Sequence, residues 1–158
     1  MTRNTVLRAH IIATAVALLT IGSFFTLSLV AELIGDPAFI RQVKTGILYG
    51  VPVLLIAMPT LGLTGKQLAG KSTHPLVQRK MRRMKFVALN GFLLIGLAVY
   101  LYFRVTHYPI DGTFLLVQLI ELLLGAVNVA LIVLNVRTGM QLSGRKVGKT
   151  AVPDRMKR

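Results

Sequence analysis

Four long apolar stretches, separated by clusters of charged and turn residues, constrain this chain more than any other feature. They cover residues 6–34, 43–63, 86–106 and 113–136. A stretch of about 18 or more apolar residues with few charges is a candidate membrane span. Within 158 residues, no segment is left for a separate soluble domain, which needs at least about 50 residues. The sequence predicts an all-α integral membrane protein, with one four-span domain (residues 1–136) forming an up-down-up-down four-helix bundle.

The segments outside the spans are short and mostly basic. Gly35-Asp36-Pro37 is a turn signal that ends the first span. Residues 64–85 are predicted to form a basic loop, and residues 137–158 a basic, flexible tail. The first span follows Arg3 and Arg8, as in a signal peptide, but it is far longer than the apolar core of about 7–15 residues in such a peptide. We expect it to remain uncleaved.

The distribution of positive charge predicts the orientation. Of the 19 Lys and Arg residues, 16 fall in the N-terminal segment, the basic loop and the tail, which leaves Arg41, Lys44 and Arg104 on the other side. Basic residues collect on the cytoplasmic side of membrane proteins. Both termini are therefore expected in the cytoplasm, with the protein in a bacterial inner membrane. This rule also explains the net charge of +14, so no nucleic-acid partner is expected.

Polar residues recur along the fourth span at spacings of three and four. On a helix this spacing places them on one face; they are Gln118, Glu121, Gly125, Asn128 and Asn135. Unpaired polar groups in hydrocarbon cost several kcal/mol each. The stripe is therefore predicted to face the interior of the bundle.

The third span carries a seam that we expect to pack beside this stripe, and its members are Asn90, Leu93, Leu97, Tyr100, Arg104 and His107. The stripe and the seam together predict two clusters of polar residues, an outer group and an inner group. The outer group contains Arg104, Gln118 and Glu121, with Glu32 as a further candidate. The inner group contains Asn90, Asn128 and Asn135, with His10 as a further candidate.

Two interpretations of these groups are open. Interhelical hydrogen bonds join membrane helices, at about 0.6 kcal/mol each, and this favours a structural role for the asparagines. Glu121 differs, because an ionisable residue about 12 Å inside the membrane is a functional-site hypothesis by default. Its structural alternative is a carboxyl that is neutral or paired with Arg104.

The positions of the three histidines indicate whether the protein could bind haem b or quinone. Haem b in small four-helix membrane proteins needs two histidines at one depth on facing helices. His10 is near the inner end of the first span, His107 is at the outer end of the third, and His74 precedes a proline in the basic loop. We therefore predict no cofactor, with His10 as the contact if haem b or quinone binds.

Other chemistries find little support in the sequence. The absence of cysteine excludes disulfides, thiol redox chemistry and thiolate metal sites, and five acids spread over the chain predict no carboxylate metal site. Residues 65–72 match the P-loop pattern, but a membrane span precedes them where that motif needs a strand, so no nucleotide partner is expected. Four residues of the basic loop are candidates for docking anionic lipid headgroups or a partner protein: Arg79, Lys80, Arg82 and Arg83.

Three classes of function fit these observations. The first is a non-enzymatic subunit or assembly factor of a larger membrane complex, bound to other membrane subunits or to further copies of itself. The second is a membrane redox protein linked to quinone or haem b. The third is a small proton-coupled transporter or channel that uses Glu121.

Overall fold

The structure is a computed structural model, and it describes residues 2–142 and 144. Within them the chain forms four long helices and no strand: α1 (Arg3–Ile34), α2 (Pro37–Ala69), α3 (Pro75–His107) and α4 (Gly112–Leu142). All four helices are long and apolar enough to cross a membrane. The predicted all-α, four-span architecture is confirmed, and the protein is a small multi-pass membrane protein.

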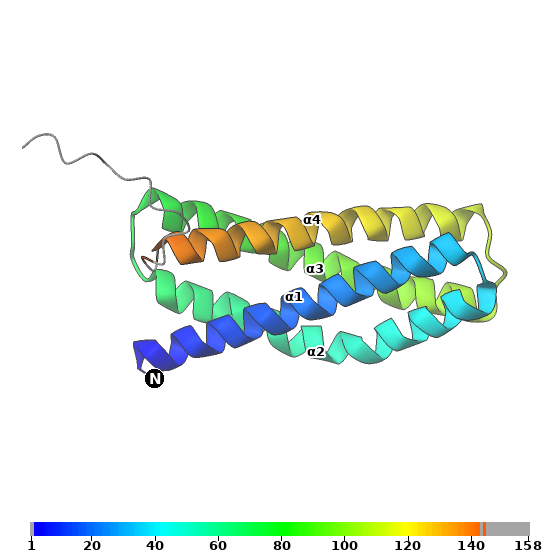
Figure 1. The fold of residues 1–158 in the computed structure, drawn as a ribbon, viewed down its shortest axis with the longest axis horizontal. Coiled ribbons are helices and arrows are strands. Elements are labelled where there is room, and N and C mark those ends of the chain that lie inside the picture. Colours follow the sequence, from blue (N-terminus) through cyan, green and yellow to red (C-terminus); the bar gives the residue numbers. More distant parts are fainter. Residues whose placement is uncertain (1, 143, 145–158) are drawn as a thin grey trace, which may run out of the picture.

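The helices alternate in direction along one common axis (Figure 1). The N-terminus, the α2–α3 connection and the C-terminal end of α4 meet at one end of the bundle. We call this the basic end, because Arg3, Arg8, Arg137 and the cationic residues between 66 and 85 gather there. The α1–α2 and α3–α4 connections lie at the opposite end.

Turn residues set the boundaries of the helices. Gly35 ends α1 in the left-handed conformation at φ 71°, where its N–H donates to the carbonyl of Ala31. Asp36 then caps α2 by accepting hydrogen bonds from the N–H groups of Ala38 and Phe39. Because Pro37 is already the first residue of α2, the connection between the first two helices is only two residues long.

The basic loop predicted over residues 64–85 is mostly helical. α2 continues to Ala69, and α3 begins at Pro75, with His74 as its cap. Proline fits the first turn of a helix, since its missing N–H would have no partner there. The helix α4 likewise continues into the predicted tail and ends at Leu142. The remainder of that tail, Gly144 apart, lies outside the described residues.

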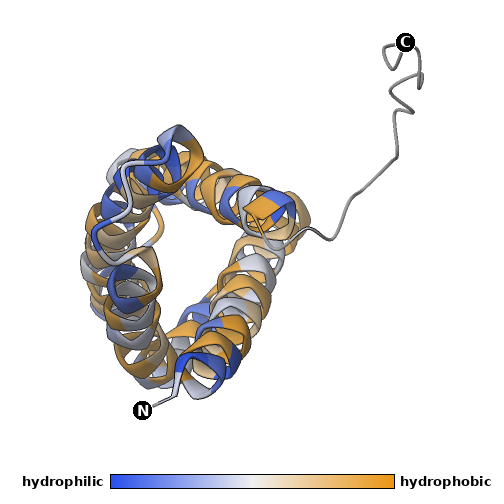
Figure 2. Ribbon diagram, turned by 90° about the vertical axis from the view of Figure 1, so that its left-hand side faces the viewer, coloured by the Kyte–Doolittle hydropathy of each residue, from blue (hydrophilic) through white to orange (hydrophobic). Residues whose placement is uncertain are grey.

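Each helix packs against two neighbours in the cyclic order α1, α2, α3, α4, and the ring closes between α4 and α1 (Figure 2). Buried residues recur at spacings of three and four, as at Ile47, Val51, Leu54, Ala57 and Leu61 of α2. This repeat is typical of left-handed helical bundles. The outward faces carry large exposed apolar side chains, such as Leu19, Ile56 and Phe92, as expected of helices surrounded by lipid.

Candidate functional site

A buried ion pair between Lys44 of α2 and Glu121 of α4 is the most unusual feature of the bundle. Lys44 Nζ lies 2.5 Å from Glu121 Oε2. Lys44 is only 1% exposed and Glu121 8% exposed. Charged residues within membrane spans are rare, pair with one another, and mark ion or proton pathways in many membrane proteins. This pair is therefore the candidate functional site.

The pair joins two helices that are diagonal to each other. The backbones of α2 and α4 are not neighbours within the described residues, so the lysine side chain crosses the interior to reach Glu121. It does so through an apolar layer that includes Ile40, Ala98 and Phe114. Such surroundings strengthen electrostatic interactions. The ion pair thus links α2 to α4 across the interior of the bundle.

Three further polar side chains surround the ion pair. Lys44 Nζ also donates to Ser28 Oγ at 3.2 Å, and Gln118 Nε2 donates to Glu121 Oε2 at 3.2 Å. Glu32, one turn beyond Ser28 on α1, interacts electrostatically with both Lys44 and Glu121. Its Oε1 atom is buried and has no hydrogen-bond partner among the described residues. The Lys44 ammonium therefore pairs with Glu121 and is within electrostatic range of a second carboxyl, Glu32, with which it forms no ion pair.

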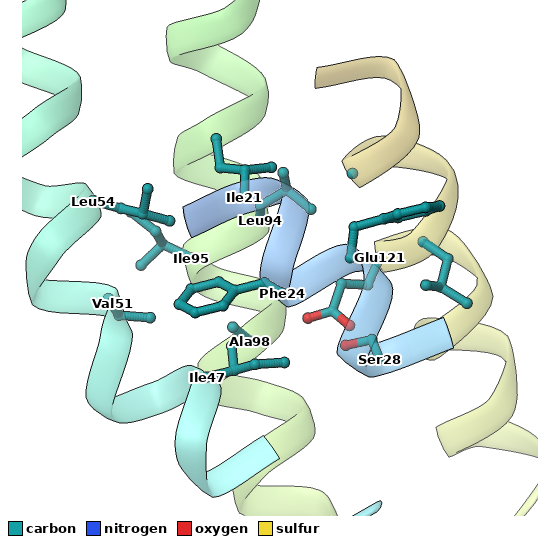
Figure 3. A pocket seen from close by; sticks show the side chains of 13 residues that line it. Ile21, Phe24, Ser28, Ile47, Val51, Leu54, Leu94, Ile95, Ala98 and Glu121 are labelled. Carbon is teal, nitrogen blue, oxygen red and sulfur yellow. The ribbon is translucent and has the colours of Figure 1, made fainter. Parts of the chain in front are cut away.

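A small cavity of about 40 Å³ adjoins this cluster (Figure 3). All four helices line it, and most of its walls are apolar, among them Ile21, Val51 and Leu94. In Figure 3 the carboxyl of Glu121 and the hydroxyl of Ser28 lie together at one end. A cavity needs roughly 10–15 Å³ to hold one buried water. The cavity has room for about three waters beside Glu121 and Ser28.

Arg104 does not pair with Glu121, contrary to one of the alternatives drawn from the sequence. Its guanidinium contacts Asp111 Oδ2 at 2.5 Å and lies over the Tyr108 ring, 4.7 Å from the centroid. Asp111 also accepts from the N–H of Phe114 and so caps α4. Arg104 therefore stabilises the connection at the opposite end, and Lys44 takes its place beside Glu121.

The predicted seam on α3 is also wrong in its register. Leu93, Tyr100 and His107 are exposed, and of the six seam residues only Asn90 is buried. The buried face instead follows Val87, Gly91, Ala98, Leu101 and Val105. The tyrosine and the histidine near the end of the helix gain from facing the headgroup region, where an aromatic ring with a polar tip is favoured.

The polar stripe of α4 faces the interior, as its spacing predicts. Gln118, Glu121, Gly125, Asn128 and Asn135 are all buried. Asn128 is fully buried and neither of its side-chain polar atoms has a hydrogen-bond partner among the described residues. Asn90 donates from Nδ2 to the carbonyl of Leu124 at 2.8 Å, but its Oδ1 is unpaired there, as is that of Asn135. The inner group therefore retains unused hydrogen-bonding capacity.

The remaining candidate residues lie at the basic end. His10 is buried, and its Nδ1 lies 3.0 Å from Thr64 Oγ1 on α2. Lys80 is half-buried beside Gly139 of α4. Arg83 donates to Thr138 Oγ1 at 3.3 Å, whereas Arg79 and Arg82 are exposed. His10 and His107 are at opposite ends of the bundle, as their positions in the sequence predict.

Comparisons of the chain with protein-family models, with curated proteins and with solved structures found no match. The functional interpretation therefore rests on the geometry of the side chains.

Sequence reasoning missed Lys44, the partner of Glu121, because it placed this lysine at the outer edge of the second span. A signal for its burial exists in the sequence. Ile40, Lys44, Ile47, Val51 and Leu54 follow one another at alternating spacings of four and three. Lys44 therefore occupies an inward position in an otherwise apolar repeat.

Proposed function

We propose that this protein is a small proton-translocating membrane protein in which Glu121 takes up and releases the proton. The observation that carries this proposal is the buried ion pair of Lys44 with Glu121, with a second carboxyl, Glu32, within electrostatic range of the same ammonium. A cluster of this composition can exist in two charge states that differ by one proton. Proton relays of membrane proteins are built from such intramembrane groups.

The proton cycle follows from the contacts of Lys44. When a proton binds to the Glu121 carboxylate, that carboxyl becomes neutral and the Lys44 ammonium loses its counter-ion. Glu32, which already interacts with Lys44, supplies a replacement negative charge within the same cluster. When Glu121 releases its proton, the pair with Lys44 forms again. The buried ammonium thus has a counter-ion in both states, which avoids the several kcal/mol that an unpaired buried charge costs.

The buried stripe of α4 supports a path for the proton. Along the helix, the distance from Gln118 to Thr138 is about 30 Å, close to the thickness of the hydrocarbon core. Unpaired side-chain atoms of Gln118, Asn128 and Asn135 lie on this stripe. Buried polar groups without protein partners are commonly hydrogen-bonded to water. Water held between these residues would connect the Glu121 cluster to the basic end.

The orientation proposed for this protein places the basic end in the cytoplasm of a bacterial cell. The support is the concentration of cations at that end, in accordance with the positive-inside rule. With Lys44 neutralised by Glu121, the asymmetry is even greater than the sequence suggests, because only Arg41 and Arg104 remain as cations at the opposite end. The Glu121 cluster then lies in the outer half of the membrane.

Proton flux into liposomes tests the proposal. The purified protein is reconstituted with a pH-sensitive dye inside the vesicles, and a potassium diffusion potential drives protons inward. We expect the wild-type protein to acidify the vesicles and Glu121→Gln to leave them like protein-free vesicles. Asp111→Asn, the same chemical change at an exposed carboxyl, is the matched control and should retain the flux. Wild-type flux no faster than that of empty vesicles, or full flux in Glu121→Gln, contradicts the proposal.

A second candidate is a subunit or assembly factor of a membrane complex. The observation that favours it is the helical form of the basic segment: α3 begins at Pro75, so Arg79 and Arg82 are exposed on a regular helix at the basic end. Purification in mild detergent tests it. Loss of a defined co-purifying membrane protein in Arg79→Gln/Arg82→Gln, combined with its retention in Glu121→Gln, supports this candidate and argues against proton translocation as the main role.

A further inference from the structure

A second pocket, separate from the Glu121 cluster, lies at the basic end. Its volume is about 80 Å³, twice that of the cavity beside Glu121. His10, Gly65, Lys80, Met81, Met84 and Leu142 are among the residues that line it, so all four helices contribute. At roughly 10–15 Å³ for each water, it has room for several waters, comparable to one phosphate group.

The lining combines a fixed polar group with an ammonium group. The His10 ring is held by its contact with Thr64, and its Cε1 would lie 3.3 Å from a Cβ added at Gly65. Lys80 is half-buried, and its Nζ lies against Gly139: a Cβ added at Gly139 would be 3.2 Å from Lys80 Nζ. Among the described residues Lys80 forms no ion pair. A partly buried ammonium without a counter-ion attracts an anion.

No carboxylate of the described residues is near enough to be that anion. The four described acids, Glu32, Asp36, Asp111 and Glu121, all belong to the opposite half of the bundle. Nine other described Lys or Arg residues surround the basic end, and they are Arg3, Arg8, Lys66, Lys71, Arg79, Arg82, Arg83, Lys85 and Arg137. The field at this pocket is therefore strongly positive.

We infer that this pocket binds a phosphate group, with Lys80 as the charged ligand and His10 as a polar wall. Basic pockets between helices at the cytoplasmic side of membrane proteins bind phospholipid headgroups in this way. The apolar side chains of Met81, Met84 and Leu142 suit the glycerol and the first acyl carbons of a lipid. The phosphate of an anionic phospholipid and free inorganic phosphate share this chemistry, and they are separated by experiment.

Ligand-dependent thermal stability of the full chain in a neutral detergent tests this inference. Phosphatidylglycerol, phosphatidylcholine and inorganic phosphate are added separately, and unfolding is followed by far-UV circular dichroism. We expect phosphatidylglycerol to raise the unfolding temperature and to bind at least about tenfold more weakly to Lys80→Gln. Lys71→Gln removes an exposed charge from the same end and should bind like the wild type. Ala69→Leu, which fills the pocket without changing its charge, should also weaken binding.

The outcomes separate the sources of the phosphate group from general attraction. Protection by inorganic phosphate alone, lost in Lys80→Gln, supports the site with a free anion as its ligand. Equal weakening by Lys71→Gln and Lys80→Gln shows non-specific attraction to the basic end and overturns the inference. So does a Lys80→Gln protein that is less stable without ligand but keeps the full lipid effect, because Lys80 then serves only to stabilise the end of α4.

Discussion

Removing Lys44 should be among the most damaging single substitutions in this protein. Lys44→Met keeps a side chain of similar length but deletes the ammonium, and with it the contacts to Glu121 and Ser28. Glu121 would retain only the hydrogen bond from Gln118 Nε2 at 3.2 Å. Breaking a buried ion pair by removing one partner costs about 3–5 kcal/mol. We expect a loss of that size in the free energy of unfolding.

The double variant Lys44→Met/Glu121→Leu distinguishes an ion-pair effect from a packing effect. With both charges replaced by apolar groups, Ser28 and Gln118 each lose one hydrogen-bond partner, at about 1 kcal/mol each. The double variant should therefore lie within about 2 kcal/mol of the wild type, although Lys44→Met alone loses about 3–5 kcal/mol. This difference corresponds to a coupling energy of several kcal/mol between the two residues.

Reversible unfolding in mixed micelles, followed by far-UV circular dichroism as SDS replaces a mild detergent, measures these free energies. Arg41→Met is the matched control, since Arg41 is an exposed cation one turn before Lys44 on α2, and it should change stability by less than about 0.5 kcal/mol. Additive effects of Lys44→Met and Glu121→Leu refute the reasoning, because residues in an ion pair cannot contribute independently. A loss below about 1 kcal/mol in Lys44→Met also refutes it.

Two further predictions concern packing and the surface. Gly50→Ala should lower the free energy of unfolding by about 1–3 kcal/mol, because its new Cβ would lie 2.5 Å from Phe24 Cζ. In Gly46→Ala the new Cβ meets nothing within 4 Å, so this variant should match or exceed wild-type stability. The same SDS titration compares the two variants, and equal effects would contradict the packing of Gly50 against Phe24. Arg104→Gln should cost less than about 1 kcal/mol, since its partner Asp111 is 43% exposed. A larger loss in thermal unfolding would mean that Arg104 interacts with the interior.

The sequence predicts the four helices well because their signals are local and strong. Span length and the Gly35-Asp36-Pro37 turn locate α1 to within a few residues, whereas the second span was predicted to begin at residue 43 and α2 begins at Pro37. The inward face of α4 also follows from its spacing, since all turns of one helix share the same periodicity. The helical ends beyond the apolar spans were missed because charged residues such as Lys66 and Arg79 continue a helix as readily as apolar ones.

The contacts between helices are less predictable from one sequence. Arg104 and Lys44 are both cations near the end of a span that is opposite the basic end, and both are candidates to meet Glu121 by depth alone. Which one does so depends on how α2 and α3 rotate about their axes. Lys44 continues the buried repeat of α2, whereas Arg104 is adjacent to the connection and meets Asp111 there. The register of α3 was mistaken for the same reason, because Tyr100 and His107 are polar but interfacial.

Infrared difference spectroscopy of the protein in lipid observes protonation of the Glu121 carboxyl itself, on which proton translocation depends. Spectra are recorded as the bulk pH is lowered stepwise, for the wild type, Glu121→Gln and Asp111→Asn. We expect a carboxylate band that converts to a protonated carboxyl band in the wild type and in Asp111→Asn, and that is missing in Glu121→Gln. A spectrum in which no pH-dependent carboxyl signal disappears with Glu121→Gln would show that the Lys44–Glu121 pair is a fixed structural ion pair.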